Sequence, residues 1–255
     1  MITTLLSRLL GAGGLTGMAS TTGAYGRRRL DNIFFPAMAL LALAIVINGF
    51  GRSYFFAGMV RAPLPSPLVH AHAAILTTWI TIQVLQPVQV AANKVEWHQR
   101  LGTFGMLVAV AVPIIAMLAA IGEVRRHPFG IRDLASDFTF AIAAIVDFTI
   151  LAFLGLRERH RDLSEHKRLM LLATISILGP AIGRLWFVTS PMIYYAVFAI
   201  LLSLVIAFDR ASLRTIPRAT IFGVVLIVVS QGLAEILWRT AAAADLVIWI
   251  QNAPR

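Results

Sequence analysis

The stretch LGTFGMLVAVAVPIIAMLAAI, at residues 101–121, carries no charged side chain over its 21 residues. A helix needs about 20 predominantly apolar residues to cross a hydrocarbon core of about 30 Å. The stretch is therefore long enough to span a lipid bilayer. It predicts that the chain is an integral membrane protein.

Comparable apolar stretches recur on both sides of this segment. We expect seven spans, at residues 33–50, 68–92, 101–121, 134–156, 167–188, 191–208 and 218–239. Lipid excludes open strand edges, and the two-residue alternation of a transmembrane β-barrel is missing, so the spans are expected to be helices. Pro113 and Pro180 fall inside spans and predict kinks there. The predicted fold is an all-α, polytopic transmembrane helical bundle of about seven spans.

The spans divide the chain into three parts. We expect a flexible basic tail at residues 1–32, a seven-helix transmembrane domain at 33–240 and a short C-terminal tail at 241–255. The first thirty residues contain Arg8 and three consecutive arginines but no acidic residue. This composition fits a flexible bacterial tail, and an organellar transit peptide is the alternative.

The composition agrees with a membrane protein. Apolar residues make up 58% of the chain and charged residues only 13%, whereas a soluble domain carries about 25% charged residues. The chain contains no cysteine, which excludes a secreted disulfide scaffold. The net charge of +10 would suggest nucleic-acid binding in a soluble protein, but in a membrane protein it first reflects basic loops on one side.

The distribution of basic residues predicts the orientation. Of the 22 Lys and Arg residues, fourteen lie in the N-terminal tail and the even-numbered loops, seven lie on the opposite side, and Arg184 lies in a span. The most basic loop holds Arg157, Arg159, Arg161, Lys167 and Arg168 and is expected to lie near anionic lipid. Lys and Arg favour cytoplasmic loops, so we expect a multi-pass protein of the bacterial inner membrane with a cytoplasmic N terminus. Its expected partner is the lipid bilayer, and no nucleic acid is expected.

The second span carries an informative polar pattern. At 100° per residue, His72, Trp79, Gln83 and Gln86 fall within about 40° of one another, and this stripe is expected to face the bundle interior. His70 lies about 160° away, so His70 and His72 do not share one metal ion on a regular helix.

Ionisable residues inside a membrane are functional candidates. Counting depth along each span predicts an outer layer of Asn48, His72, Asp137, Arg184 and Glu235. Arg184 is expected either to form a structural ion pair with Asp137 or Glu235 or to belong to a substrate or proton site. Asp147 lies alone near the middle of the fourth span. It is expected either to carry a proton or to form a hydrogen bond with a neighbouring hydroxyl or amide.

A second layer is expected near the cytoplasmic face. Its members are Gln86, His98, Arg100 and His166. Imidazole is a ligand of haem iron, copper and zinc, so His98 and His166 are candidates for an axial pair on one haem or for two ligands of a metal ion. His72 is the candidate for a separate metal site or a proton relay, unless hydrogen bonds between helices satisfy it. The alternative is that both inner histidines hydrogen-bond to loop carbonyls.

Histidine motifs follow one another along residues 30–190. They are His70-x-His72, then Trp79 and Gln86, then His98-x-Arg100-Leu101-Gly102, then His166-Lys167-Arg168-Leu169-Met170, and finally Arg184. This order resembles a group of bacterial multi-pass membrane proteins of unknown function, and the His-x-Arg-Leu-Gly entry to the third span is its most specific piece. The chain is more distantly similar to transmembrane b-type cytochromes, which implies haem b. Those cytochromes place their ligating histidines on facing helices, whereas His70 and His72 share one helix.

Three functional hypotheses remain. The first is a redox-associated protein that binds haem b or a transition metal through His98 and His166, with Arg184 balancing a propionate or another anion. The second is a proton-coupled transporter in which Asp147, Glu235 and Arg184 line a polar path. The third is an accessory or assembly subunit of a membrane complex, in which the polar layers are structural. The chain carries no recognisable hydrolase motif, and whether it is an enzyme stays open.

Overall fold

The computed structural model describes residues 12–56, 65–126 and 130–254, with side chains from Arg29 onward. These residues form helices and turns, and no β-strand is present among them. The elements are α2 (Ala12–Phe50), the π-helical turn η1 (Gly51–Phe55), α3 (Pro67–Ala91), α4 (Val95–Arg126), α5 (Ile131–Glu158), α6 (Leu163–Ser176), α7 (Gly179–Ile182), α8 (Pro191–Leu213), α9 (Arg218–Leu237) and α10 (Ala241–Asn252). The expected all-α fold is confirmed.

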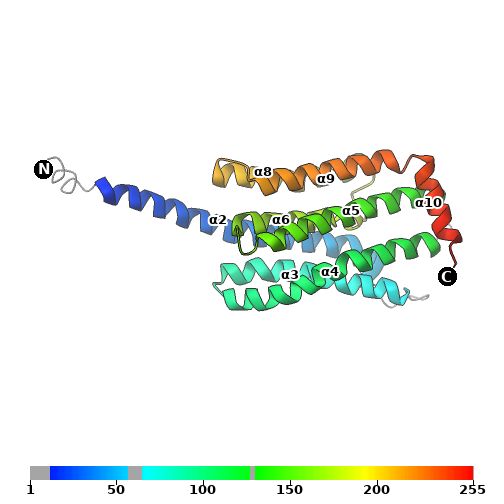
Figure 1. The fold of residues 1–255 in the computed structure, drawn as a ribbon, viewed down its shortest axis with the longest axis horizontal. Coiled ribbons are helices and arrows are strands. Elements are labelled where there is room, and N and C mark those ends of the chain that lie inside the picture. Colours follow the sequence, from blue (N-terminus) through cyan, green and yellow to red (C-terminus); the bar gives the residue numbers. More distant parts are fainter. Residues whose placement is uncertain (1–11, 57–64, 127–129, 255) are drawn as a thin grey trace, which may run out of the picture.

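Six helical segments of the described chain are long and apolar enough to cross a membrane, and they run lengthwise in one bundle (Figure 1). They are Arg29–Phe55, Pro67–Ala91, Val95–Arg126, Ile131–Glu158, Pro191–Leu213 and Arg218–Leu237. A seventh pass is made by α6 and α7, which follow one another across a short break. The protein is therefore a polytopic transmembrane bundle of about seven spans, as the sequence predicts.

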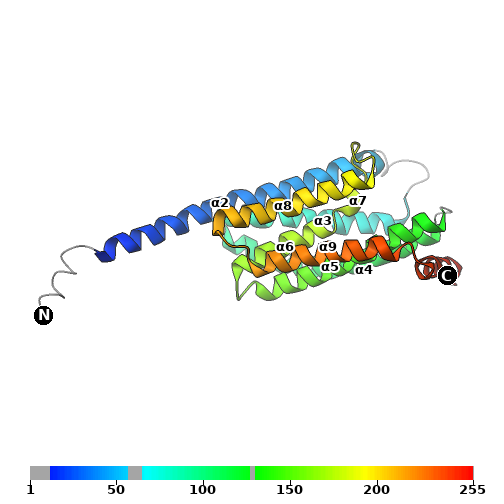
Figure 2. The same ribbon diagram turned by 90° about the horizontal axis from the view of Figure 1, so that it is seen from above.

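The two ends of the bundle differ. The turns that join α3 to α4, α5 to α6 and α8 to α9 lie at the end where α2 enters, which we call the proximal end (Figures 1 and 2). At the opposite, distal end, α10 lies across the bundle and buries Val247 and Ile250. The expected C-terminal tail thus contains a helix. The expected flexible N-terminal tail is helical from Ala12, and its residues 1–11 lie outside the described part of the chain.

The local sequence explains where several helices begin. Ser66 and Ser190 each accept a hydrogen bond from the backbone N–H three residues later, and a proline follows each serine at the first helical position, where no N–H is needed. The Asp162 carboxylate caps α6 by accepting from two backbone N–H groups, at 2.8 and 3.1 Å. Pro113, in contrast, lies inside the continuous helix α4.

Helix α6 is the centre of the bundle. Every residue from 171 to 176 is buried, and a helix that is buried on all sides belongs to the core. Glycines let α5 and α9 approach it closely. A Cβ at Gly155 would lie 2.8 Å from the sulfur of Met170, and a Cβ at Gly223 would lie 2.6 Å from a methyl carbon of Leu172. Larger residues at these two positions would push the helices apart.

The span expected at 167–188 is broken instead of simply kinked. α6 ends shortly before Pro180, which has no N–H to continue the helical hydrogen bonds. Leu178 and Ala181 are buried at the break. A Cβ at Gly49 of α2 would overlap the carbonyl oxygen of Ala181, so α2 covers the break closely. Irregular backbone at membrane depth is tolerated where the protein buries it in this way.

Candidate functional site

His98 lies in the first turns of α4, at the proximal end, and joins α4 to α3. Its Nδ1 lies 3.3 Å from the carbonyl oxygen of Gln86, and the Gln86 amide donates in return to the His98 carbonyl at 3.1 Å. Gly102, one turn further on, lies next to the same amide, since a Cβ there would be in ordinary van der Waals contact with its nitrogen at 3.6 Å. The two hydrogen bonds between His98 and Gln86 therefore link α3 to α4.

His166 lies in the second turn of α6, also at the proximal end, and joins α6 to α5. Its Nδ1 lies 2.6 Å from the carbonyl oxygen of Gly155. The close packing of α5 on α6 at Gly155 brings the imidazole within reach of that carbonyl. The histidine of α6 and the glycine of α5 thus hold these two helices together.

The two histidines share a hydrogen-bonding arrangement. A carbonyl oxygen accepts and does not donate, so Nδ1 must carry the proton in both His98 and His166. In a neutral imidazole this leaves Nε2 as the free acceptor atom. Histidines that bind metals are oriented in the same way, by an N–H bond from the other ring nitrogen to a carbonyl or carboxylate.

Although they are far apart in sequence, the fold brings the two rings close enough to interact electrostatically. His166 interacts electrostatically with His98, Arg159 and His160. Among the residues that the structure describes, no group of three or more His, Cys, Asp or Glu side chains is arranged to hold a metal ion. The arrangement is thus a histidine pair and not a three-ligand cluster.

Arg100, expected in the same layer, is placed elsewhere. It lies at the surface, pairs with Glu96 at 2.6 Å and lies over the ring of Trp97. The i,i+4 spacing of Glu96 and Arg100 puts both side chains on one exposed face of α4. The inner layer therefore consists of Gln86, His98 and His166, without Arg100.

A buried network of charged and polar side chains, centred on Arg168 and Asp209, adjoins this layer. It was not predicted from the sequence. Arg168, expected in a basic loop, is only 1% exposed, and its partner Asp209 is 0% exposed. The Arg168 Nε donates to both carboxylate oxygens of Asp209, at 2.8 and 3.0 Å, and its Nη1 donates to the carbonyl and hydroxyl oxygens of Ser164. Thr220 donates to Asp209 at 2.5 Å. The network joins α6, α8 and α9.

Two signals point to this network. Residues two apart on a helix differ by about 200°, so if His166 faces one neighbouring helix, Arg168 faces another. Asp209 is also the only acidic residue between residues 191 and 217, which makes it the natural partner for an arginine in that layer. Neighbouring contacts add to the network: Lys167 pairs with Asp31 of α2 at 2.5 Å.

Asp147 lies inside the bundle, on α5. It is 0% exposed, and one carboxylate oxygen accepts a hydrogen bond from the Ser230 hydroxyl of α9 at 2.5 Å. The other carboxylate oxygen is buried and has no hydrogen-bonding partner within the described ranges. A buried carboxyl with one unpaired oxygen is costly to keep charged. Its chemistry is therefore that of a group able to hold a proton.

The expected stripe on α3 lies partly inside the bundle. Trp79 is fully buried and packs edge-on against Phe148 of α5, with ring centroids 4.9 Å apart. His72 and Gln83 are half-buried, as is Gln86. His70 is helical, so the expected separation of His70 from His72 holds, and its ring bonds to the Tyr54 hydroxyl at 2.8 Å.

Three residues of the expected outer layer gather near the distal end. Arg184 follows α7 and interacts electrostatically with His72 of α3 and with Asp137 of α5. Arg184 and Asp137 are exposed. Arg184 is thus far along the bundle from His98 and His166, and it does not balance charge at that pair as expected from the sequence.

The other two members of the expected outer layer lie elsewhere. Asn48 is exposed, and its amide donates to the Ala44 carbonyl of its own helix at 2.8 Å. Glu235 pairs with Arg239, in the turn that follows α9, and accepts a hydrogen bond from the Tyr195 hydroxyl at 2.8 Å. Depth along the span was correct for both, but depth does not say which way a side chain faces.

Comparison of the chain with protein-family models, with curated proteins and with solved structures finds no match. The role of these groups therefore rests on their geometry and chemistry.

Proposed function

We propose that this protein is a membrane redox protein in which His98 and His166 bind one metal centre, either haem b iron or a single transition-metal ion. One observation carries the proposal. Each imidazole is held through Nδ1 on a backbone carbonyl, at Gln86 and at Gly155, which leaves Nε2 as the ligand atom on both rings.

The residues at the proximal end suit such a centre. Haem iron takes two axial ligands, so a histidine pair is sufficient, and imidazole also binds copper and zinc. The metal would supply one-electron chemistry, while the two carbonyl bonds orient the rings and raise their basicity. Arg159 interacts electrostatically with His166 and offers positive charge to an anionic group such as a haem propionate.

The test is purification of the full chain in mild detergent from cells supplied with haem precursor, iron, copper and zinc. An absorbance spectrum and metal analysis follow. A Soret band identifies haem, and near-equimolar metal without a Soret band identifies a bound ion. Absence of both signals overturns the proposal, and co-purification with a larger complex in that case favours an accessory subunit.

Asparagine variants separate the ligand role from a structural role. In His98→Asn and His166→Asn, the amide N–H can still donate to the same carbonyl, but the Nε2 ligand atom is gone. We expect both variants to lose the metal centre while they unfold close to the wild-type temperature. The matched control is His70→Asn, since His70 bonds to Tyr54 and should leave the centre unchanged. Retention of the centre in the two test variants contradicts the proposal.

We also propose that the proximal end faces the cytoplasm of a bacterial cell, with the chain in the inner membrane. Basic residues in the proximal turns, among them Lys94, Arg159, Arg161 and Arg214, support this orientation. Because the chain has no cysteine, single cysteines report sidedness cleanly. A membrane-impermeant thiol reagent should label Asn252→Cys in intact cells and Arg161→Cys only after lysis. The reverse labelling contradicts the orientation.

A second function, proton-coupled transport, is favoured by Asp147. This carboxyl is fully buried and pairs with Ser230 through one oxygen only. The test is proton flux in proteoliposomes that contain a pH-sensitive dye. We expect Asp147→Asn to abolish the flux, and Asp137→Asn, at the exposed surface, to preserve it. An unchanged flux in Asp147→Asn, or no flux in the wild type, rejects this candidate.

A further inference from the structure

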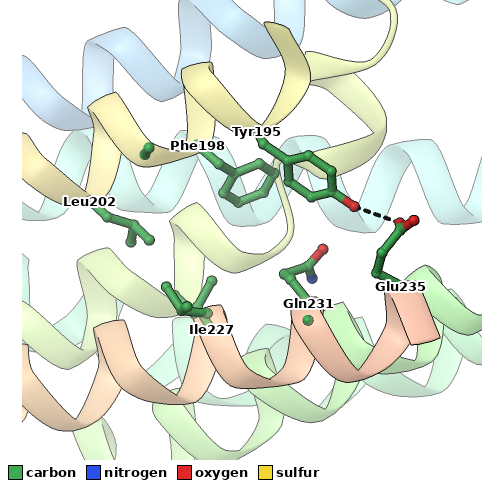
Figure 3. Close-up of a pocket in the computed structure, with 9 residues that line it drawn as sticks. Tyr195, Phe198, Leu202, Ile227, Gln231 and Glu235 are labelled. Carbon is green, nitrogen blue, oxygen red and sulfur yellow. Dashed lines mark hydrogen bonds between the residues drawn. The ribbon is translucent and has the colours of Figure 1, made fainter. Parts of the chain in front are cut away.

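A groove lies between α8 and α9, away from the histidine pair. It has a volume of about 260 Å³ and is lined by Tyr195, Phe198 and Leu202 of α8 and by Ile227, Gln231 and Glu235 of α9, among others (Figure 3). Both helices are candidate membrane spans, so the open side of the groove faces lipid. Molecules dissolved in the bilayer can enter it sideways.

The part of the groove nearer the bundle centre is apolar. Phe198, Leu202 and Ile227 are buried and form its floor, while Val228 stands exposed at its edge. Gly232 also lines the groove, and a Cβ at that position would meet no atom within 4 Å. The floor therefore offers an apolar surface of the kind that an alkyl or isoprenoid chain packs against, and the open space at Gly232 lies further along α9, beside Gln231.

The distal part of the groove is polar. Gln231 projects from α9 toward Tyr195 and Phe198 on α8 (Figure 3). Its side-chain oxygen is buried and lacks a hydrogen-bonding partner in the described ranges of the chain. Both oxygens of Glu235 are engaged, by the Tyr195 hydroxyl and by Arg239. The unsatisfied group in the groove is thus an acceptor, and its complement is a neutral donor.

We propose that this groove binds a lipid-soluble aromatic alcohol of the quinol class. A phenolic hydroxyl donates to the side-chain oxygen of Gln231, the ring lies against Tyr195 and Phe198, and the apolar tail runs past Leu202 toward the middle of the bilayer. Aromatic rings pack favourably edge-on or offset, which suits the two aromatic walls. The phosphate diester of a phospholipid accepts hydrogen bonds and has no proton to donate to the Gln231 oxygen. The site is independent of the metal centre proposed above.

The test is equilibrium binding of decylhydroquinone to the full chain in nanodiscs. The comparison ligand is its dimethyl ether, which has the same ring and tail but no hydroxyl donor. We expect saturable binding of the hydroquinone and at least tenfold weaker binding of the ether, since the bond to Gln231 is lost. Equal binding of the two ligands overturns the proposal.

Matched variants of α9 locate the site. Gly232→Leu places a side chain in the groove at a position where a Cβ meets no atom, and it should abolish binding. Val229→Leu places the same leucine side chain at an exposed position outside the lining and should leave binding unchanged. Gln231→Leu should reduce hydroquinone binding to the level of the ether. Thermal unfolding of each variant confirms that the bundle is intact.

Two outcomes separate this proposal from its alternatives. If hydroquinone does not bind and native mass spectrometry finds a phospholipid retained by the wild type but lost in Gly232→Leu, the occupant is a phospholipid and the proposal fails. If Gly232→Leu binds hydroquinone as the wild type does, the site lies elsewhere and the proposal also fails. His98→Asn should bind hydroquinone as the wild type does. The quinol proposal can therefore be tested even if the proposed metal centre proves absent.

Discussion

Oppositely charged residues pair differently at the proximal and distal ends of the bundle. At the proximal end, Arg168 and Asp209 pair between helices in the interior, with both side chains almost fully buried. At the distal end, Glu235 of α9 pairs with Arg239 in the turn that follows, with side-chain exposures of 35% and 58%. The difference follows from the central position of α6, which buries the Arg168 side chain.

This contrast indicates where the fold is held and where it can accept ligands. A buried ion pair that is broken leaves an uncompensated charge, so the proximal end is fixed in one arrangement. Exposed pairs contribute little, and the distal end keeps an unsatisfied acceptor at Gln231 and open space at Gly232. The first end suits a fixed site, and the second suits exchange with the bilayer.

The largest expected effect comes from breaking the buried pair. Arg168→Ala leaves Asp209 buried without its partner and should lower the free energy of unfolding by about 3–5 kcal/mol. Arg239→Ala removes an exposed pair and should cost about 0–1 kcal/mol. Denaturant unfolding in detergent measures both. Similar small losses in the two variants would remove the contrast between the ends.

A double variant checks the cause of that loss. Arg168→Met combined with Asp209→Leu replaces both charges with apolar side chains, so no charge is left unpaired. We expect this variant to recover most of the stability lost in Arg168→Ala. Failure to recover would mean that the hydrogen bonds to Ser164 and Thr220, and not the buried charge, dominate the effect.

The second effect compares two glycines. Gly155→Val forces a side chain against Met170 and should cost about 1–3 kcal/mol, with displacement of His166 from its carbonyl partner. Gly232→Ala adds a methyl group in open space within a helix and should stabilise by about 0.5–1 kcal/mol. Thermal unfolding of both variants distinguishes the packed interior from the groove. Destabilisation by Gly232→Ala contradicts the open groove.

A smaller effect is expected at Asp147. Ser230→Ala removes its hydrogen-bond donor and should cost about 1 kcal/mol. The control is Thr149→Ala, because the Thr149 hydroxyl bonds to a carbonyl of its own helix and leaves no partner in another helix unsatisfied. Denaturant unfolding in detergent measures the difference. Equal effects would mean that the hydrogen bond between α5 and α9 through Ser230 does not contribute to the free energy of unfolding.

The smallest effect is expected at the exposed surface. Asn48→Leu removes a side chain that bonds only to its own helix, and the change in the free energy of unfolding should stay within about 0.5 kcal/mol. Thermal unfolding against the wild type measures it. A loss above 1 kcal/mol would place Asn48 in an internal layer, contrary to its exposure.

The sequence predictions used two kinds of position: the angle of a residue around its own helix and its depth along the span. The two differed in how well they placed residues. Helical angles correctly placed the buried Trp79 on the inner face of α3, because rotation within one helix is set by its own geometry. Depth along a span grouped His98 with His166 and His72 with Arg184. Depth also grouped Asn48 and Glu235 with an interior that they do not reach, because the rotation of each helix is set by its neighbours.

The amino-acid sequence by itself determined the solvent, the helical form and about seven passes through the membrane, since apolar length and the need to satisfy the backbone in lipid depend only on local composition. Tertiary structure alone decided which charges are partners. Arg168 and Asp209 lie 41 residues apart, and their pairing requires α6 to be the central helix and α8 to present Asp209 to it. That choice depends on packing between helices, including the close approaches at Gly155 and Gly223, which no single stretch of sequence specifies.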